Sequence, residues 1–339
     1  MTRRYPPTLV EMLREEMTAA GLLAPLADPE TTDLMVNADG SVWLQHLARG
    51  HVALDGEVAA DRLESLLGTV ASLTGAVINA ERPILEATLP FHEARLEAVL
   101  PPLSTAPLVA IRKPPARLLA LDDLVANGTL PGELAERLAA AVRARRTCAV
   151  AGGVGSGKTT LVNALLAAIL AAEPDERVVI LEEGARELHA EGANVLRLLT
   201  SDAAGVGMTE LLRAALRLNP SRILVGEARG REALDFLRAA NTGHPGSLLT
   251  LHANGARDAL SRLDTLAQEA GVPSQLARVC EALDLVVFVA REGTARRVAE
   301  VVRVGALGRD GVPETETLYQ RDGGEGRRSL SPNGPGGER

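Results

Sequence analysis

The fold class of this chain is decided by Gly152-Gly153-Val154-Gly155-Ser156-Gly157-Lys158-Thr159. This stretch, called the phosphate loop below, matches the phosphate-binding pattern G-x-x-x-x-G-K-[ST] at every position. Its glycines allow successive backbone N–H groups to turn toward one anion. Lys158 is expected to reach the β- and γ-phosphates of a nucleotide, and the Thr159 hydroxyl to hold Mg²⁺. Together with Thr160, these residues are the predicted cofactor-binding segment.

The residues on both sides of the phosphate loop support this prediction. Residues 148–151 form a short apolar run that is typical of a buried strand, and residues 161–170 form a run suited to a helix. A strand, a loop and a helix in this order place bound phosphates at a helix N-terminus, where the helix dipole favours negative charge. The sequence therefore predicts ATP and Mg²⁺ as cofactors.

Composition and charge narrow the class of protein. The 339 residues are enough for about two domains, and 46% hydrophobic with 24% charged residues is ordinary for a globular protein. Aromatic residues make up only 2% and the formal net charge is −8, which argues against direct nucleic-acid binding. The first residues lack the apolar core of a signal peptide, and the longest apolar stretch, 161–172, is too short to span a bilayer. We therefore expect a cytoplasmic protein, held at the inner face of the membrane through partners. The two cysteines, Cys148 and Cys280, are expected to be small buried hydrophobes.

The amino-terminal part is predicted to be a small mixed α/β domain over residues 1–113. The expected elements are helices at 8–22 and 58–77, a hairpin of strands 33–37 and 41–45, and strand-like runs at 87–99 and 108–112. Residues 114–130, which begin with Pro114-Pro115, are predicted to be a linker because consecutive prolines stop regular structure.

The second part, residues 131–307, is predicted to be an α/β domain that carries the phosphate loop. Helical patterns separate most of its candidate strands, which favours a largely parallel sheet covered by helices. The candidate strands are 147–151, 177–182, 222–226, 247–252, 284–290 and 297–304. Residues 308–339 are rich in Gly, Arg, Glu and Pro and are predicted to form a disordered tail.

Two acidic positions follow predicted strands of this domain. Glu182 and Glu183 end one strand, where ligands of open α/β sheets collect. Glu182 is predicted to orient or deprotonate the attacking water, and Glu183 to assist through Mg²⁺. Glu227 ends another strand after Gly226 in a Walker B pattern. Thr159, Glu182 and Glu227 are the predicted Mg²⁺ ligands, partly through water. The alternative for Glu182 and Glu183 is an acidic strand end in solvent, and the alternative for Glu227 is an acid that caps a helix.

Two histidines flank the strand at 247–252. His244 lies in the turn before this strand, and His252 lies at its far end. Their predicted role is to sense the γ-phosphate or to link the nucleotide state to a neighbouring subunit. The alternative is that each is a structural residue with satisfied hydrogen bonds.

Taken together, these motifs resemble the secretion and conjugation ATPase superfamily, which drives type II and type IV secretion and type IV pili. The resemblance runs from about Pro25 to about Val304 and is strongest to the TrbB-type conjugal-transfer branch. The segments that carry it are 82–87, Leu100-Pro101-Pro102, 110–113, Gly226-Glu227-Ala228-Arg229-Gly230, 241–246 and 285–290. The sequence departs from the family where Glu183 replaces an aspartate, where Phe91-His92 follows Leu-Pro, and where Asn219 precedes Pro220.

The resemblance implies a RecA-like ATPase domain, a smaller PAS-like amino-terminal domain for sensing and oligomerisation, and a homohexameric ring. It also implies that nucleotide lies between the two domains, where arginines of the amino-terminal domain reach the phosphates. Arg95 and Arg112 match those positions and suit the role because guanidinium is planar and permanently charged. The alternative for each is a surface ion pair. The catalytic set is therefore Lys158, Glu182, Glu183, Glu227, His252, Arg95 and Arg112.

The expected function is an ATP-hydrolysing hexameric motor of a type IV secretion or conjugal-transfer apparatus, with inner-membrane secretion or pilus proteins as partners. One alternative is a Tad-type pilus-assembly ATPase. A second is a RecA-like nucleic-acid motor, against which the net charge and the low aromatic content argue. A third is a nucleotide-sensing scaffold that does not hydrolyse ATP, against which the complete set of acids argues.

Overall fold

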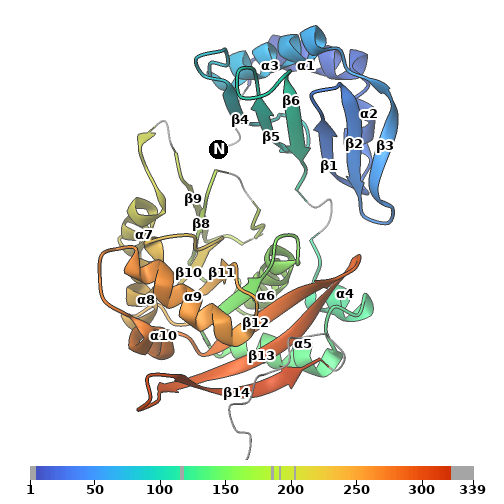
Figure 1. Ribbon diagram of the computed structural model, residues 1–339. Coiled ribbons are helices and arrows are strands. Elements are labelled where there is room, and N and C mark those ends of the chain that lie inside the picture. Colours follow the sequence, from blue (N-terminus) through green and yellow to red (C-terminus); the bar gives the residue numbers. More distant parts are fainter. Residues whose placement is uncertain (1–4, 115–117, 185–186, 191, 202–203, 322–339) are drawn as a thin grey trace, which may run out of the picture.

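Two β-sheets with separate hydrophobic cores organise the chain (Figure 1). The computed structural model describes residues 5–114, 118–184, 187–190, 192–201 and 204–321. In Figure 1 the amino-terminal sheet, in blue and teal, lies above the carboxyl-terminal sheet. Within these described ranges, no helix combines the length and the apolar character needed to cross a bilayer.

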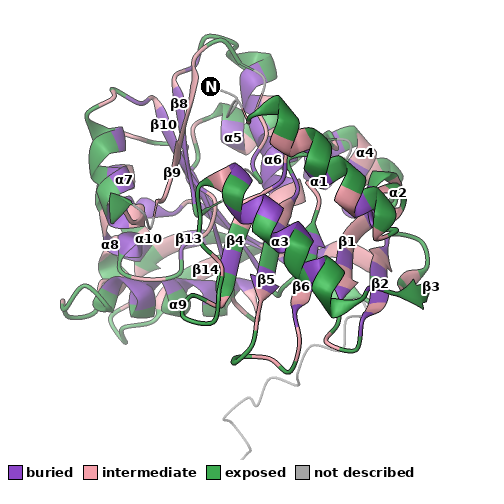
Figure 2. Ribbon diagram, turned by 90° about the horizontal axis from the view of Figure 1, so that it is seen from above, coloured by how far each residue is buried: buried purple, intermediate pink, exposed green. Residues whose placement is uncertain are grey.

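The amino-terminal sheet has six strands in the order β3-β2-β1-β6-β5-β4, and every neighbouring pair is antiparallel. Its strands are β1 (Thr31–Val36), β2 (Ser41–His46), β3 (Gly50–Glu57), β4 (Ile84–Thr88), β5 (Arg95–Val99) and β6 (Leu108–Arg112). Helices α1 (Pro7–Ala19) and α3 (Ala60–Thr74) pack side by side over it, and α2 (Leu23–Ala27) precedes β1. Figure 2 shows buried stretches along α3, whose buried residues share one hydrophobic core with those of α1 and the sheet. The amino-terminal domain therefore has the predicted mixed α/β architecture, while its description as PAS-like stays a prediction.

The predicted hairpin and helices of this part are confirmed, but the run at 87–99 is not one strand. It divides into the end of β4 and all of β5, with Thr88 paired opposite Arg95. His92 and Glu93 adopt positive φ angles of 56° and 51° in the intervening turn. Pro90 lacks a backbone N–H to donate to the sheet, which favours a turn here. Arg95 is consequently the first residue of β5, an inner strand between β4 and β6.

The carboxyl-terminal sheet has eight strands in the order β14-β13-β12-β7-β11-β10-β8-β9. The six strands from β12 to β9 are parallel, and β13 and β14 add an antiparallel edge. The strands are β7 (Cys148–Gly152), β8 (Val178–Glu182), β9 (Val195–Leu199), β10 (Arg222–Val225), β11 (Leu248–Leu251), β12 (Leu285–Glu292), β13 (Ala295–Leu307) and β14 (Pro313–Gln320). The largely parallel sheet predicted from the alternation of elements is confirmed.

Helices cover both faces of this sheet, so β7, β8, β10 and β11 are buried along their whole length. One face carries α4 (Leu121–Ala126), α5 (Gly132–Arg143) and α6 (Lys158–Ala172). The other face carries α7 (Met208–Leu216), α8 (Glu232–Asn241), α9 (Ala256–Gln268) and α10 (Leu276–Ala282). Because the central strands run parallel, their carboxyl ends meet at one edge, and this edge holds the phosphate loop.

Two predicted boundaries are wrong. The predicted linker 114–130 contains α4, and Leu121, Leu124 and Leu130 are buried in the core beside α5 and α6. Burial of these apolar side chains therefore outweighed the tendency of consecutive prolines to stop regular structure. Residues 115–117 lie outside the described part. The predicted disordered tail contains β14, which pairs with β13 from Pro313 to Gln320. Residues 322–339 of that tail lie outside the described part.

Candidate nucleotide-binding site

The phosphate loop connects the central strand β7 to α6, so all the predicted cofactor-binding residues belong to one strand–loop–helix unit. A Cβ on Gly152 would stand 2.3 Å from the Val289 carbonyl oxygen and 2.5 Å from Ser156 Oγ, so only glycine fits there. Gly157 precedes α6 with a φ of +99°, which favours glycine. Thr159 and Thr160 lie in the first turn of α6. The loop therefore directs a helix N-terminus at the site where an anion binds.

The Lys158 side chain is buried within the phosphate loop. Its Nζ donates hydrogen bonds to the carbonyl oxygens of Gly152 and Gly153, at 3.1 and 3.0 Å. Burial lowers the pKa of Lys158, and the nearby carboxylate of Glu227 opposes that shift. A desolvated ammonium that donates to neutral carbonyls gains much from an anionic partner.

His252 connects Lys158 to Glu227. Its Nδ1 lies 3.3 Å from Lys158 Nζ and 3.1 Å from the Gly152 carbonyl oxygen, and its Nε2 lies 2.6 Å from Glu227 Oε1. An ammonium has only donors, so Lys158 can bond to Nδ1 only where that ring nitrogen carries no proton, while Nε2 stands at ion-pair distance from Glu227 Oε1. The structure thus brings together three residues that the sequence predicted separately.

Arg229 extends these contacts to the second acidic position. Its Nη2 lies 2.8 Å from Glu227 Oε2, and its Nη1 contacts the Glu183 carboxylate. Lys158, His252, Glu227, Arg229 and Glu183 therefore form one series of polar contacts, called the contact chain below. Arg229 was not among the predicted site residues. Its position two residues after the Walker B acid was the signal that would have identified it.

Glu182 lies outside the contact chain. Its side chain is buried, and Oε1 accepts hydrogen bonds from the backbone N–H groups of Glu187 and Leu188 at 2.7 and 2.6 Å. Burial raises the pKa of Glu182, against the effect of those two hydrogen bonds. Gly226 lies directly beside it, since a Cβ there would stand 3.2 Å from Glu182 Cγ. The described contacts bring Glu182 to the same sheet edge as Glu227 without joining the two carboxylates.

The residues present fit a Mg²⁺ ion that is held mainly by nucleotide and water. The described side chains contain no cluster of three or more His, Cys, Asp or Glu that would hold a metal ion unaided. Glu227 Oε2 already accepts a hydrogen bond from Arg229, and its Oε1 lies 2.6 Å from the His252 ring nitrogen Nε2. Mg²⁺ is usually held by one or two protein groups together with phosphates and waters. The Thr159 hydroxyl therefore stays the predicted direct ligand, and the carboxylates would act through water.

The two predicted arginines stand opposite each other on neighbouring strands of the amino-terminal sheet, in the pair Arg95↔Arg112. The Arg95 guanidinium reaches the carboxyl-terminal domain, because its Nη2 lies 3.2 Å from the position of a Cβ on Gly184. Gly184 directly follows Glu183, so Arg95 lies beside the acidic loop after β8. Arg112 is exposed at the end of β6. On its other side Arg112 pairs with Asp33 of β1, so an opposite charge flanks it within the sheet. The predicted contact of Arg95 and Arg112 with phosphates stays a prediction.

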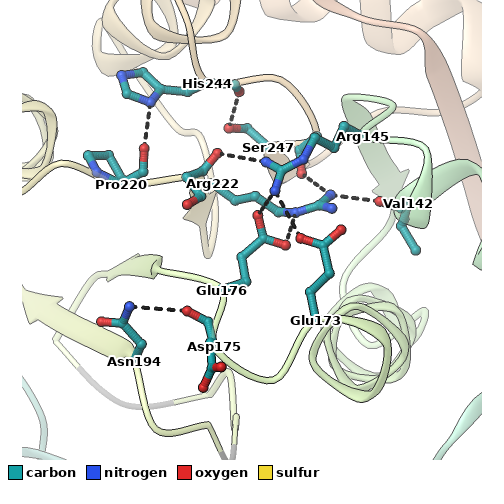
Figure 3. Close-up of polar contacts among 12 residues, drawn as sticks. Val142, Arg145, Glu173, Asp175, Glu176, Asn194, Pro220, Arg222, His244 and Ser247 are labelled. Atoms are coloured by element: carbon teal, nitrogen blue, oxygen red, sulfur yellow. Dashed lines mark hydrogen bonds and ion pairs between the residues drawn. The ribbon is translucent and has the colours of Figure 1, made fainter.

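His244 precedes β11, so it lies at the edge of the sheet opposite the phosphate loop, and Figure 3 shows it beside Pro220. Its Nδ1 lies 2.9 Å from the Pro220 carbonyl oxygen, and β11 separates it from His252. Strand β11 pairs in parallel with β7 from Leu248↔Cys148 to Leu251↔Ala151. His244 is therefore not placed to sense a phosphate on the loop, and its predicted link to a neighbouring subunit stays a prediction.

An open cavity of about 570 Å³ lies beside the phosphate loop, between it and the start of α9. Its lining residues are Gly153, Val154, His252, Ala253, Asn254, Asp258, Ser261 and Arg262. Val154 is 80% exposed at its rim. The cavity gives a ligand on the loop direct access to His252 and, through it, to the contact chain.

Comparison with known proteins agrees with this geometry. The family model of the type II/IV secretion system proteins matches residues 17–323. Conjugal transfer protein TrbB of Rhizobium radiobacter is 39% identical over 301 residues, which cover 89% of this chain and 92% of that protein. Type IV secretion system protein PtlH of Bordetella pertussis is 35% identical, with 85% and 93% covered.

Two solved structures share the fold. The ATPase DotB of Legionella pneumophila aligns with a TM-score of 0.58 and 19% identity, covering 91% of this chain and 83% of DotB. The pilus retraction motor PilT with bound ADP aligns with a TM-score of 0.58 and 19% identity, covering 92% and 83%. The family model spans both sheets, and TrbB aligns along nearly the whole chain. This chain therefore belongs to the type II/IV secretion system protein family.

Proposed function

We propose that this protein is an ATP-hydrolysing motor of a type IV secretion or conjugal-transfer apparatus. The observation that carries the proposal is the contact chain, which joins the phosphate-loop lysine to both acidic positions of the sheet edge. The relatives named above are conjugal-transfer and type IV secretion proteins, which supports a secretion motor over a pilus-assembly motor.

Lys158 is the residue through which nucleotide binding acts. Phosphate oxygens carry full charges and would replace the carbonyl oxygens of Gly152 and Gly153 as partners of its ammonium group. Movement of the ammonium toward phosphate removes the donor from Nδ1 of His252. His252 and Glu227 then rearrange, so the contact chain responds to the nucleotide state.

Glu182 and Glu227 have different proposed roles. The raised pKa of buried Glu182 suits a general base for the attacking water. Its Oε2 accepts no hydrogen bond within the described residues, and Arg197 Nη1 lies 3.8 Å from it. Glu227, already paired with Arg229 and His252, would orient Mg²⁺ through water. The bound Mg²⁺ supplies electrostatic stabilisation of the charge that develops on the phosphates.

Arg95 and Arg112 would couple hydrolysis to domain movement. Arg95 lies beside Gly184, directly after the Glu183 end of the contact chain. A nucleotide bound between the domains would attract both guanidinium groups, and loss of the γ-phosphate would weaken that attraction and release the amino-terminal domain. In a homohexameric ring docked on membrane partners, such movements would do mechanical work.

Lys158→Ala tests the proposed function. Phosphate release from ATP and Mg²⁺ should fall by roughly a hundredfold or more, because the charge that stabilises the transition state is lost. Arg303→Ala is the control, since it removes a cation from an exposed pair with Glu316 on the distant β13–β14 hairpin. Far-UV circular dichroism checks that both variants fold. Undiminished turnover in Lys158→Ala would overturn the proposal, as would absence of turnover in the wild-type protein assembled as a ring.

A further inference from the structure

The β12–β13 hairpin extends past the phosphate loop and places two arginines against it. Strand β12 pairs with β7 as far as Val289↔Gly152 and then continues beyond the loop. Arg296 Nε donates to the Gly155 carbonyl oxygen at 3.4 Å, and Arg296 Cγ lies 3.3 Å from the position of a Cβ on Gly157. Arg291 Nη1 lies 3.9 Å from the position of a Cβ on Gly155.

These two arginines form an unneutralised positive pair. Arg291 and Arg296 are direct cross-strand partners, so their side chains share one face of the hairpin. Their hydrogen bonds go to the carbonyl oxygens of Gly293, Gly155 and Thr294. Within the described chain, neither guanidinium forms an ion pair with a carboxylate. Burial lowers the pKa of Arg296, and the charge of Arg291 lowers it further. Two adjacent cations beside an anion-binding loop indicate an anionic ligand.

The strand order identifies the part of the nucleotide that would contact this pair. Strand β12 flanks β7 on one side, and β11 and β10 flank it on the other. His252 and Glu227 follow β11 and β10, so the γ-phosphate that is cleaved must face their side. The hairpin arginines lie on the opposite side of the phosphate loop. The part of the nucleotide that faces this side is therefore the part nearer the sugar.

We propose that Arg291 and Arg296 bind the α-phosphate, the phosphate group next to the ribose, of the nucleotide held by the phosphate loop. Guanidinium suits this contact because its planar fork donates two parallel hydrogen bonds to phosphate oxygens. This inference rests on the proposed ATPase function and adds the β12–β13 hairpin as a second side of the binding site. ATP and ADP share the α-phosphate, so both ligands lose the same contact when the arginines are removed.

The test compares the double variant Arg291→Gln/Arg296→Gln with Arg297→Gln. Arg297 belongs to the same hairpin but pairs with Ala290 and donates to the Asn127 carbonyl oxygen, so it serves as the matched control. Isothermal titration with ADP and with a non-hydrolysable ATP analogue measures Kd, and steady-state phosphate release gives KM and kcat. The double variant should raise Kd for both ligands by the same factor of about 10 to 100. In turnover the loss should appear in KM rather than in kcat.

Two outcomes would overturn the inference. One is an unchanged Kd for ADP in the double variant. The other is weakened binding of the ATP analogue alone, which would place the arginines at the γ-phosphate. The single variant Arg291→Gln, at an exposed position, keeps the test valid if the double variant folds poorly, and a smaller equal rise in both Kd values is expected for it. Failure of this inference can be distinguished from failure of the proposed function. The proposed function fails if wild type does not hydrolyse ATP or if Lys158→Ala hydrolyses it undiminished, whereas this inference is decided by the Kd values of the hairpin variants.

Discussion

Arg222→Met should destabilise the carboxyl-terminal domain by about 3–5 kcal/mol, because it removes one partner of a buried ion pair. The Arg222 side chain is fully buried at the start of β10 (Figure 3). Its Nε lies 2.9 Å from Glu176 Oε2, and its Nη1 donates to the carbonyl oxygens of Val142 and Gly246 at 2.7 and 3.2 Å. The substitution therefore leaves one carboxylate and two carbonyl groups without this donor.

The size of the effect depends on how much compensation remains. Arg145 Nη2 lies 2.5 Å from Glu176 Oε1, so the carboxylate keeps one cation, although the Arg145 side chain is 36% exposed. This remaining pair favours the lower half of the range. A domain of this size loses about 2–4 °C in Tm per kcal/mol, so a decrease of roughly 6–15 °C is expected.

Thermal unfolding followed by far-UV circular dichroism measures this decrease. The chain has one tryptophan, Trp43 in β2, so its fluorescence reports on the amino-terminal domain and provides an internal comparison. Arg303→Met, which breaks an exposed pair with Glu316, should change Tm by no more than about 2 °C.

A double-mutant cycle separates the ion pair from other effects of the substitution. Adding Glu176→Gln to Arg222→Met removes the poorly compensated carboxylate, so the double variant should lose less stability than the sum of the two single variants. The reasoning is refuted if Arg222→Met unfolds within about 2 °C of wild type, or if the two single effects simply add.

Two further predictions concern the site and the core. Gly226→Ala should lower kcat for ATP roughly ten- to hundredfold without preventing folding. The new Cβ would stand 3.2 Å from Glu182 Cγ and displace that carboxylate. Unchanged phosphate release would contradict this prediction. Burial raises the pKa of Cys148 to about 12, so the folded protein should not react with iodoacetamide at Cys148 at pH 8, as peptide mass mapping would show. The same shift means that the unfolded thiol releases its proton first, so the free energy of unfolding should fall as pH rises from about 9 toward 12. Rapid labelling of native Cys148 would contradict the predicted burial. So would a free energy of unfolding of wild type that does not decline over this pH range relative to that of Cys148→Ala.

Much of the carboxyl-terminal domain follows from local sequence patterns. The apolar runs that became β7, β8, β10 and β11 are continuous because these strands are covered on both faces, and such runs are visible without knowing the partners. Errors arose where distant packing decided the outcome. Helix α4 and strand β14 have weak local signals, and contacts with the α5–α6 core and with β13 stabilise them.

The sequence by itself determined the chemistry of the phosphate loop, the acids at the strand ends and the parallel α/β class, because each is encoded within one continuous stretch of chain. Only the tertiary structure decided which of these groups meet. Parallel pairing of β11 with β7 brings His252 to Lys158 and carries His244 to the opposite edge. Likewise, the order β12-β7-β11-β10 places the arginine pair of the hairpin on the side of the phosphate loop away from Glu227. Strand order and register depend on side chains that lie far apart in sequence, so no local pattern encodes them.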